Sequence, residues 1–208
     1  MSRGSPALTA ARKEEIIQAC AKLYETMSFK EITIKEIGAA TSFTRTSIYN
    51  YFETKEEIFL ALLQKEYEMW VDAMNAVMAE KAAMTRDELA QVLARTLTDR
   101  PRLLRLLSMN LYDMEANSRP ERLAEFKVAF GASMNAVSRM LQTYVPEIND
   151  GDRRTFLYSF FPFIYGIYPY TSVTEKQKAA MEQASIPYVY QSAYSLTYAC
   201  LKKLLGIN

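Results

Sequence analysis

The chain has 208 residues, with 25 Lys and Arg, 24 Asp and Glu, two Cys and no His, and its formal net charge is +1. Half of the residues are hydrophobic and 24% are charged, which is typical of a globular protein and excludes a disordered or collagen-like chain. Without histidine, a His-based catalytic triad and a His metal ligand are excluded. Cys20 and Cys200 are too far apart for a CxxC motif, so we expect buried, reduced thiols, no metal site and no cofactor.

The first fifteen residues lack a continuous apolar core, so we expect no signal peptide and a cytoplasmic protein. Residues 155–174 and 183–201 carry no charge and are long enough to cross a bilayer. Each stretch contains proline and four tyrosines, which favour interfaces over the hydrocarbon centre. We therefore favour helices covered on both faces over membrane spans.

Apolar residues at helical spacing and N-cap residues predict helices throughout, and no alternating strand pattern occurs. Thr54 with Glu57, Thr85 with Glu88 and Ser118 with Glu121 are candidate capping boxes. In chain order the predicted helices cover about 9–27, 33–40, 44–51, 54–81, 85–99, 101–114, 118–144, 150–168, a short charged segment after Thr174, and 187–205. Pro162 should kink the eighth helix and Pro169 should end it. The predicted fold class is all-α.

The helices near the amino terminus have the spacing of a helix-turn-helix. The first helix of the pair is 34–40, the turn is 41–43, and the second helix, 44–51, has the length that fits the major groove of DNA. None of its outward positions is acidic; they are Arg45, Thr46, Ser47, Tyr49 and Asn50. The alternative is an ordinary helical hairpin, since Ser, Thr and Asn are common at solvated positions.

Residues 9–65 resemble the amino-terminal domain of the tetracycline-repressor (TetR) family of transcriptional regulators. The resemblance rests on Thr33-Ile-Lys-Glu-Ile37, on Ile48-Tyr-Asn-Tyr-Phe52 and on Lys55-Glu-Glu-Ile58. Two positions depart from the family pattern. Ser42 stands where a turn glycine is usual, which predicts a costly left-handed residue, and Gly38 stands where alanine is more common.

The resemblance implies roles for these residues. Thr33, Tyr49 and Lys55 would contact phosphates and fix the register on DNA. Arg45, Thr46 and Asn50 would face bases, where Arg favours guanine and Asn favours adenine. Thr44 and Ser47 complete the predicted DNA-binding set, and both Thr33 and Thr44 are expected to cap their helices.

Charge and helix order predict two domains. Residues 1–52, the predicted DNA-binding domain, contain seven basic and five acidic residues, a charge of +2. Residues 53–208, the predicted ligand-binding and dimerisation domain, contain 18 basic and 19 acidic residues, a charge of −1. Because a basic excess of +2 is modest for a DNA-binding protein, we expect a homodimer on a pseudo-palindromic operator in double-stranded DNA.

The helices at about 152–168 and 187–205 are apolar on both sides and should form the dimer interface, as the resemblance also implies. Methionine and aromatic residues from several helices of the predicted ligand-binding domain suggest a cavity for a small apolar or aromatic ligand. A fully packed core without a cavity explains the same residues equally well. The candidate lining is Trp70, Met74, Met109, Tyr112, Phe126, Phe130, Met134, Phe163 and Tyr165.

Together these features predict a ligand-responsive, sequence-specific transcriptional regulator, a repressor that the ligand releases from its operator. Helix 54–81 starts beside the reading helix and carries Trp70 and Met74, so a ligand that prefers one placement of this helix would change the spacing of the two reading helices. We expect no catalytic residues. The alternatives are an enzyme built on carboxylate or lysine clusters and a helical adaptor that binds another protein through its apolar faces.

Overall fold

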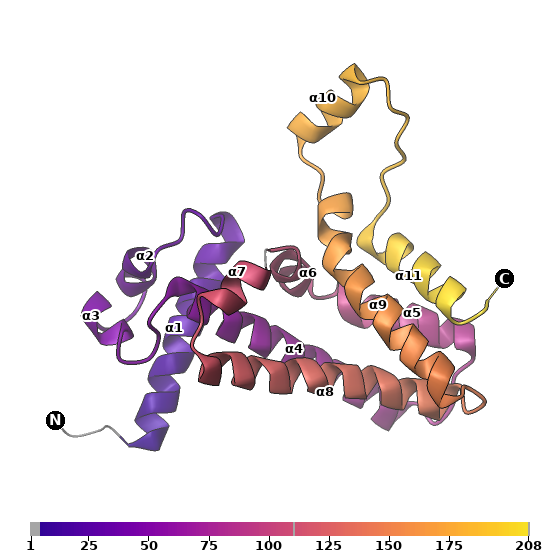
Figure 1. Ribbon diagram of the computed structural model, residues 1–208, viewed down its shortest axis with the longest axis horizontal. Coiled ribbons are helices and arrows are strands. Elements are labelled where there is room, and N and C mark those ends of the chain that lie inside the picture. Colours follow the sequence, from indigo (N-terminus) through magenta and orange to yellow (C-terminus); the bar gives the residue numbers. More distant parts are fainter. Residues whose placement is uncertain (1–4, 110, 208) are drawn as a thin grey trace. The chain divides into compact units, whose positions relative to one another are not determined.

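The computed structural model describes residues 5–109 and 111–207, which fold into helices without a strand, as the sequence predicts (Figure 1). In chain order the helices are α1 (Pro6–Thr26), α2 (Ile34–Ala39), α3 (Arg45–Ile48), α4 (Lys55–Glu80), α5 (Arg86–Thr98), α6 (Pro101–Leu107), α7 (Leu111–Ala116), α8 (Pro120–Tyr144), α9 (Asp150–Thr171), α10 (Glu175–Gln183) and α11 (Ala193–Leu204). Among these helices, none combines the length and apolar character that a membrane span requires.

The described residues form two compact units. The first comprises residues 5–66 together with 111–130, and the second comprises residues 67–109 together with 131–207. The long helices α4 and α8 therefore each begin in the first unit and end in the second. The first unit thus includes α7 and the start of α8, although these follow the helix-turn-helix by some sixty residues.

The core of the first unit is built from the apolar stripes of its helices. Ile16 and Cys20 of α1, Ile37 of α2, Ile48 of α3 and Phe59 of α4 are completely buried. Burial raises the pKa of the Cys20 thiol to about 12, so this cysteine behaves as a small apolar residue. Cys200, which was also expected to be buried, lies half-buried on α11 because that helix is covered on one side only.

The second unit packs α11 against α5 and α9, and α6 against α9. Trp70 and Met74 of α4 are completely buried, as are Leu93 of α5 and Phe160 of α9. The Trp70 indole N–H donates to Thr96 Oγ1 at 3.1 Å, so its one polar atom is satisfied inside the core.

The three candidate capping boxes differ in the structure. Thr85 and Glu88 form the complete box at the start of α5. Thr54 Oγ1 accepts from the Glu57 N–H at 3.1 Å, but the Glu57 carboxylate accepts from the Glu53 N–H at 2.8 Å. Ser118 donates its hydroxyl to the Met114 carbonyl at 2.7 Å, and α8 begins two residues later.

Three predicted helix boundaries are wrong. The helix expected over 101–114 ends at Leu107, where the Ser108 hydroxyl donates to the Arg105 carbonyl at 2.7 Å, and α7 follows as a separate helix. Pro169 does not end α9, because it lies in the last turn and removes a single donor there, and the helix continues to Thr171. The last helix begins at Ala193 rather than near 187, because Ser192 provides its N-cap and accepts from the Ser195 N–H at 3.0 Å.

Candidate nucleic-acid interface

The first unit contains the predicted helix-turn-helix. Helices α2 and α3 contact each other, and the turn between them covers residues 41–43. They approach closely at Gly38, where a Cβ atom would lie 3.2 Å from Cα of Arg45. A side chain at this position would push α3 outward, so Gly38 sets the distance between the two helices.

The regular part of the reading helix is shorter than predicted, since α3 spans four residues and continues as a turn through Tyr51. Ile48 is completely buried and fixes this helix to the unit. The residues around it keep the predicted outward placement. Arg45, Thr46, Tyr49 and Asn50 are exposed, and Ser47 is half-buried.

Two threonines lie at the starts of these helices. Thr33 caps α2, because its Oγ1 accepts from the Lys35 N–H at 3.2 Å and the Glu36 N–H at 3.5 Å. Thr44 occupies the N-cap position of α3, but its hydroxyl pairs with Ser47 Oγ at 3.1 Å rather than with a backbone N–H. The predicted side-chain cap at Thr44 is therefore wrong. Both threonines are exposed.

The turn is fixed by a carboxylate from α1. Glu15 accepts from the Ser42 N–H at 2.5 Å and from the Ser42 hydroxyl at 3.0 Å. These two hydrogen bonds hold the pKa of Glu15 below its ordinary value. Ser42 does not have the expected left-handed conformation. Among the described residues, Ser185 is the non-glycine residue that has a positive φ angle. A serine therefore serves in this turn without backbone strain.

Aromatic and basic side chains brace the end of the reading helix. Arg12 donates to the Tyr51 hydroxyl at 3.3 Å, and its guanidinium lies 5.9 Å from the centroid of the Phe43 ring. On the exposed face, Arg45 donates to the Tyr49 hydroxyl at 3.3 Å. The two predicted DNA-contacting residues thus lie side by side at i and i+4.

Lys55 lies at the first turn of α4 and is half-buried. Its ammonium donates to the carbonyls of Phe29 at 2.8 Å and Ile32 at 3.2 Å, and it lies 4.0 Å from the centroid of the Phe29 ring. An ammonium has three donors, of which these carbonyls take two. Lys55 therefore ties α4 to the loop before α2.

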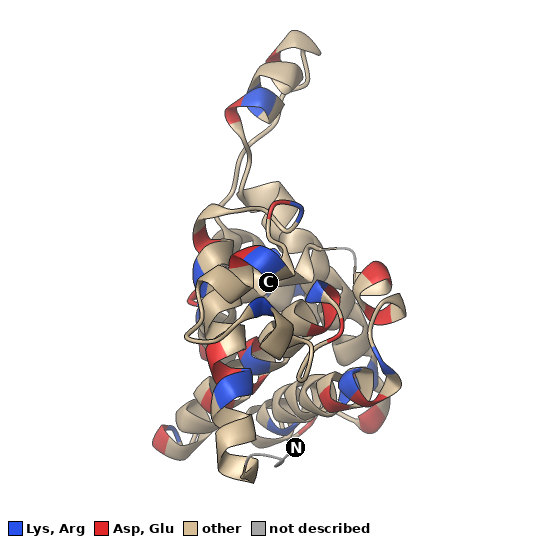
Figure 2. Ribbon diagram, turned by 90° about the vertical axis from the view of Figure 1, so that its left-hand side faces the viewer, with Lys and Arg blue, Asp and Glu red and all other residues tan. Residues whose placement is uncertain are grey.

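Charge is mixed over this unit rather than gathered in one basic patch. Figure 2 shows Lys and Arg interspersed with Asp and Glu along the helices. The net charge of +2 for residues 1–52 arises from this mixture, while α3 itself carries one arginine and no acidic residue. Electrostatic attraction for DNA phosphates is therefore expected mainly at the reading helix, which carries Arg45 and no acidic residue.

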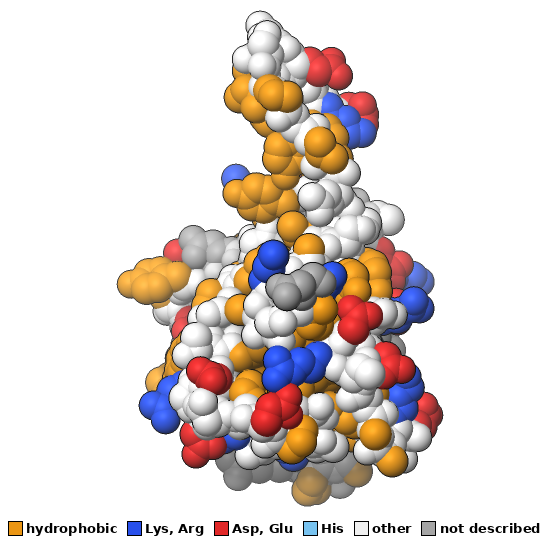
Figure 3. Space-filling view, turned by 90° about the vertical axis from the view of Figure 1, so that its right-hand side faces the viewer, with side chains coloured by type: hydrophobic (Ala, Val, Ile, Leu, Met, Phe, Trp, Pro, Cys, Tyr) orange, Lys and Arg blue, Asp and Glu red, His pale blue; other side chains and the backbone are white. Residues whose placement is uncertain are grey.

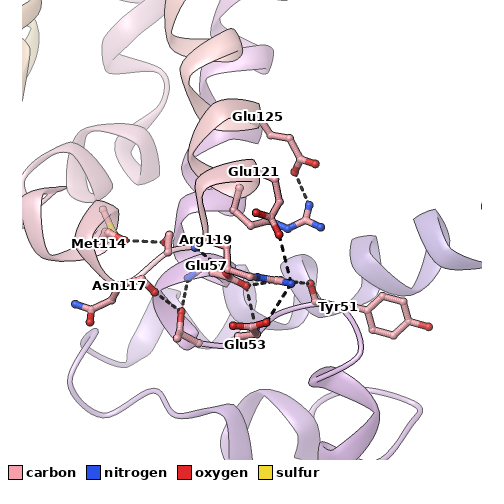
Figure 4. Close-up of polar contacts among 11 residues, drawn as sticks. Tyr51, Glu53, Glu57, Met114, Asn117, Arg119, Glu121 and Glu125 are labelled. Atoms are coloured by element: carbon pink, nitrogen blue, oxygen red, sulfur yellow. Dashed lines mark hydrogen bonds and ion pairs between the residues drawn. The ribbon is translucent and has the colours of Figure 1, made fainter.

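A buried ion pair connects α4 to the segment before α8 (Figure 4). Glu57 is 1% exposed, and its carboxylate accepts from Arg119 Nε at 2.6 Å, from Arg119 Nη2 at 2.8 Å and from the Arg119 backbone N–H at 3.0 Å. The bidentate geometry gives a strong, directional pair. Hydrogen bonds from Arg119 and from the Glu53 N–H outweigh desolvation and lower the pKa of Glu57.

The same guanidinium extends this contact to the helix-turn-helix. Arg119 Nη2 donates to the Tyr51 carbonyl at 3.3 Å, and Nη1 lies 3.4 Å from a carboxylate oxygen of Glu53 (Figure 4). We call Arg119, Glu57 and the Tyr51 carbonyl the Arg119 clamp. No local sequence pattern marks this clamp, because Arg119 is more than sixty positions from its partners.

The nine candidate ligand-lining residues divide between the two units. Tyr112, Phe126 and Phe130 belong to the first unit, where Phe126 is buried and Tyr112 is 81% exposed. Met109, Met134, Phe163 and Tyr165 are half-buried in the second unit, which also contains Trp70 and Met74.

The second unit brings some of these residues together. Trp70 and Phe161 have ring centroids 6.0 Å apart, and the Tyr165 and Tyr67 hydroxyls lie 3.2 Å apart. Phe163 instead lines an open groove of about 330 Å³ along α9.

The comparisons with known proteins cover both parts of the chain. A family model described as "Bacterial regulatory proteins, tetR family" matches residues 16–62. A second, described as "Tetracyclin repressor-like, C-terminal domain", matches residues 64–191. Among curated proteins, the nucleoid occlusion factor SlmA of Shewanella frigidimarina is 28% identical over 99 residues, which are 47% of this chain and 50% of that protein. The chain thus matches about half the length of this curated relative.

Solved structures resemble the chain over nearly its whole length. FadR of Bacillus halodurans, a fatty acid degradation regulator, has a TM-score of 0.59 at 15% identity, covering 99% of this chain and 97% of that one. FadR of Bacillus subtilis, solved with stearoyl-CoA, has a TM-score of 0.59 at 19% identity, covering 94% and 99%. PfmR of Thermus thermophilus has a TM-score of 0.60 at 13% identity, covering 92% and 97%. At these identities the likeness shows the fold.

Proposed function

Because the chain belongs to the TetR family of DNA-binding transcriptional regulators, we propose that it is a repressor that a small apolar or aromatic ligand releases from a pseudo-palindromic operator. The observation that carries the proposal is the exposed face of α3. Arg45, Thr46, Tyr49 and Asn50 surround the buried Ile48 and include no acidic residue.

In this proposal the reading helix lies in the major groove. Arg45, Thr46 and Asn50 face base edges, where arginine suits guanine and asparagine suits adenine. Tyr49 and Thr33 contact phosphates, and the third ammonium donor of Lys55 does the same. Thr44 and Ser47 complete the contact surface at the start of α3, although their hydroxyls also bond each other.

We propose that a homodimer presents two such helices. One short reading helix contacts few base pairs, so a two-fold pair on two half-sites supplies the affinity and the specificity. The uncharged stretches of α9 and α11 support an interface there, since aromatic residues are enriched and charges are depleted at the core of protein interfaces.

The proposed ligand site is the interior of the second unit around Trp70, Met74 and Tyr165, with Met109, Met134 and Phe163 as further candidates from this unit. The paired Tyr67 and Tyr165 hydroxyls offer a polar anchor beside an aromatic wall. Tyr112, Phe126 and Phe130 remain candidates from the first unit. The stearoyl-CoA held by the Bacillus subtilis FadR structure adds long-chain acyl compounds to the apolar and aromatic compounds for a first screen.

Release requires the ligand to prefer one of two states of the protein. Helix α4 begins in the unit that contains the reading helix and ends in the unit that contains Trp70. A ligand that favours another placement of α4 would change the spacing of the two reading helices. Because operator half-sites have a fixed spacing, a small change of this kind would reduce affinity.

Selection of bound duplexes from a random pool tests the proposal directly, since it gives the half-site sequence and the half-site spacing together. We expect two inverted half-sites and a loss of retention when an apolar ligand from a thermal-shift screen is added. A confirmed dimer that enriches no sequence, even at low ionic strength, would overturn the DNA-binding assignment. Retention that every ligand leaves unchanged would overturn the release mechanism.

A further inference from the structure

The segment between α9 and α11 leaves the body of its unit as a protrusion (Figure 1). It comprises residues 172–192 and contains α10. No residue between Ile167 and Thr197 is buried, and none of the nine residues of α10 is buried. An isolated helix of this length is marginal in water, so its stability depends on contacts with other surfaces.

The end of this segment exposes large apolar side chains. Ile186 and Val189 are 51% and 80% exposed, and Tyr188 and Tyr190 are 40% and 42% exposed. Tyr170, near the end of α9, is 60% exposed. Figure 3 shows hydrophobic side chains gathered over the protrusion. Contiguous apolar patches of this kind on a folded chain mark a surface that another molecule covers.

The end of α10 adds a second sign that the segment is not self-supporting. Ser185 follows the C-cap with φ of 54°, in the left-handed region that glycine normally occupies at this position. A serine in this conformation is less favourable than a glycine. No residue of α10 is buried, so packing of this helix does not offset that cost. The complete capping box of Thr174 and Gln177 fixes only its first turn.

We propose that residues 172–192 form an arm that folds against a second copy of this chain, with Tyr188 and Tyr190 buried only in that dimer. The inference rests on the proposed function, because it extends the dimer described there. The arm is continuous with α9 and α11, whose uncharged stretches are the proposed interface. A two-fold axis makes the exchange reciprocal, so each arm buries its aromatic side chains on the other copy.

Charge favours a second copy over a charged partner. Residues 172–192 contain Lys176 and Lys178 against Glu175 and Glu182, so the arm has no net charge. It therefore repels neither an identical arm nor the uncharged stretch 155–171 of α9, and it offers no basic excess for nucleic acid or anionic lipid.

Grooves at the base of the arm are suited to receive aromatic side chains. One, of about 330 Å³, is lined by Phe163 and Gly166 of α9 with Tyr188 and Val189 of the arm. Another, of about 320 Å³, is lined by Pro169 and Tyr170 of α9, by residues of α10, and by Tyr188 and Tyr190 of the arm. Both are predominantly apolar and open, which suits side chains from a second copy.

The first measurement is hydrogen exchange over residues 174–190 at protein concentrations above and below the dimer dissociation constant. We expect the α10 amides to be protected in the dimer and to exchange freely in the monomer. Equal protection in both would show that the arm folds on its own chain and would overturn the inference. Protection that appears only on adding lipid vesicles would overturn it as well.

The second measurement compares the double variant Tyr188→Ser, Tyr190→Ser with the control Val128→Ser, which changes an exposed apolar residue of the first unit. Sedimentation velocity should show a dimer dissociation constant raised about 10-fold or more by the arm variant, as for interface tyrosines in general, and unchanged by the control. A double variant that dimerises and retains DNA like the parent would overturn the arm while the proposed function stands. A parent dimer that ignores DNA but needs its arm would support the arm and overturn the proposed function.

Discussion

The reading helix α3 and the arm helix α10 are both short, and they are held in opposite ways. α3 has four residues, yet it is fixed by the buried Ile48, by the close approach at Gly38 and by the bonds from Glu15 to the turn. α10 has nine residues and buries none of them. The comparison teaches that side-chain anchors, and not helix length, decide whether a helix has a fixed place in the single chain.

The Arg119 clamp should be the strongest anchor of the fixed region. Arg119→Met leaves the Glu57 carboxylate buried without its cation. Because the Arg119 side chain is 29% exposed, we expect a loss of about 2–4 kcal/mol in the free energy of unfolding, somewhat less than for a fully buried pair. Urea unfolding at neutral pH measures this change.

The matched control is Arg153→Met, which removes an ion pair with Asp150 on α9. The Asp150 side chain is 83% exposed, so this change should cost about 0–1 kcal/mol. Equal losses for the two variants would show that the clamp has no special structural role.

The contact residues of α3 test whether its fixed placement serves DNA recognition. Asn50→Ala and Arg45→Ala should each lower discrimination at particular bases by about 1–3 kcal/mol, whereas Tyr49→Ala and Lys55→Ala should weaken binding to all sequences. Gel shifts on matched and mutated operators measure both effects.

Lys81→Ala, at an exposed position outside the proposed DNA and dimer surfaces, is the control for loss of positive charge, and it should bind DNA like the parent. Since Lys55 also bonds two carbonyls, the unfolding free energy of Lys55→Ala is measured beside its affinity. If all four α3 and α4 variants bind every duplex like the parent, the assigned roles are wrong.

Replacing two glycines by alanine should change the free energy of unfolding in opposite directions. Gly38→Ala places a Cβ 3.2 Å from Cα of Arg45, so it should shift α3 and cost about 1 kcal/mol. Gly131→Ala lies inside α8, where a Cβ meets nothing within 4 Å, and should stabilise by about 0.5–1 kcal/mol. Thermal unfolding of both variants measures the difference. A Gly38→Ala protein as stable as Gly131→Ala would show that the spacing of α2 and α3 is not tight.

The smallest expected effect is a pH dependence. The pKa of Glu15 is lower in the folded chain than the value of about 4.3 for an unfolded glutamate, so its stabilisation is present above that pH and is lost as the pH falls through the folded value. The difference in melting temperature between the parent and Glu15→Gln should therefore be largest at neutral pH and shrink in acid. Glu182→Gln, which removes a carboxylate outside this turn, is the control. A constant offset for Glu15→Gln would contradict the role of the Ser42 bonds.

The sequence predicted where helices occur, but it predicted some helix boundaries incorrectly. Helix ends depend on single hydrogen bonds, such as the Ser108 hydroxyl at the end of α6 or the Ser192 cap of α11, and many serines can make such bonds. The Glu57 carboxylate was assigned to a capping box and instead faces Arg119. Local patterns do not register a partner more than sixty residues away.

Helical periodicity and N-cap residues act within a few positions, so they were enough to predict the all-α class, the helix-turn-helix and the outward positions of the reading helix. Tertiary contacts were needed to show that α7 and the start of α8 join the first unit, that Arg119 holds the end of the helix-turn-helix, and that residues 168–196 lie outside the core. Burial and long-range ion pairs depend on which helices pack against each other, and local sequence patterns do not specify that packing.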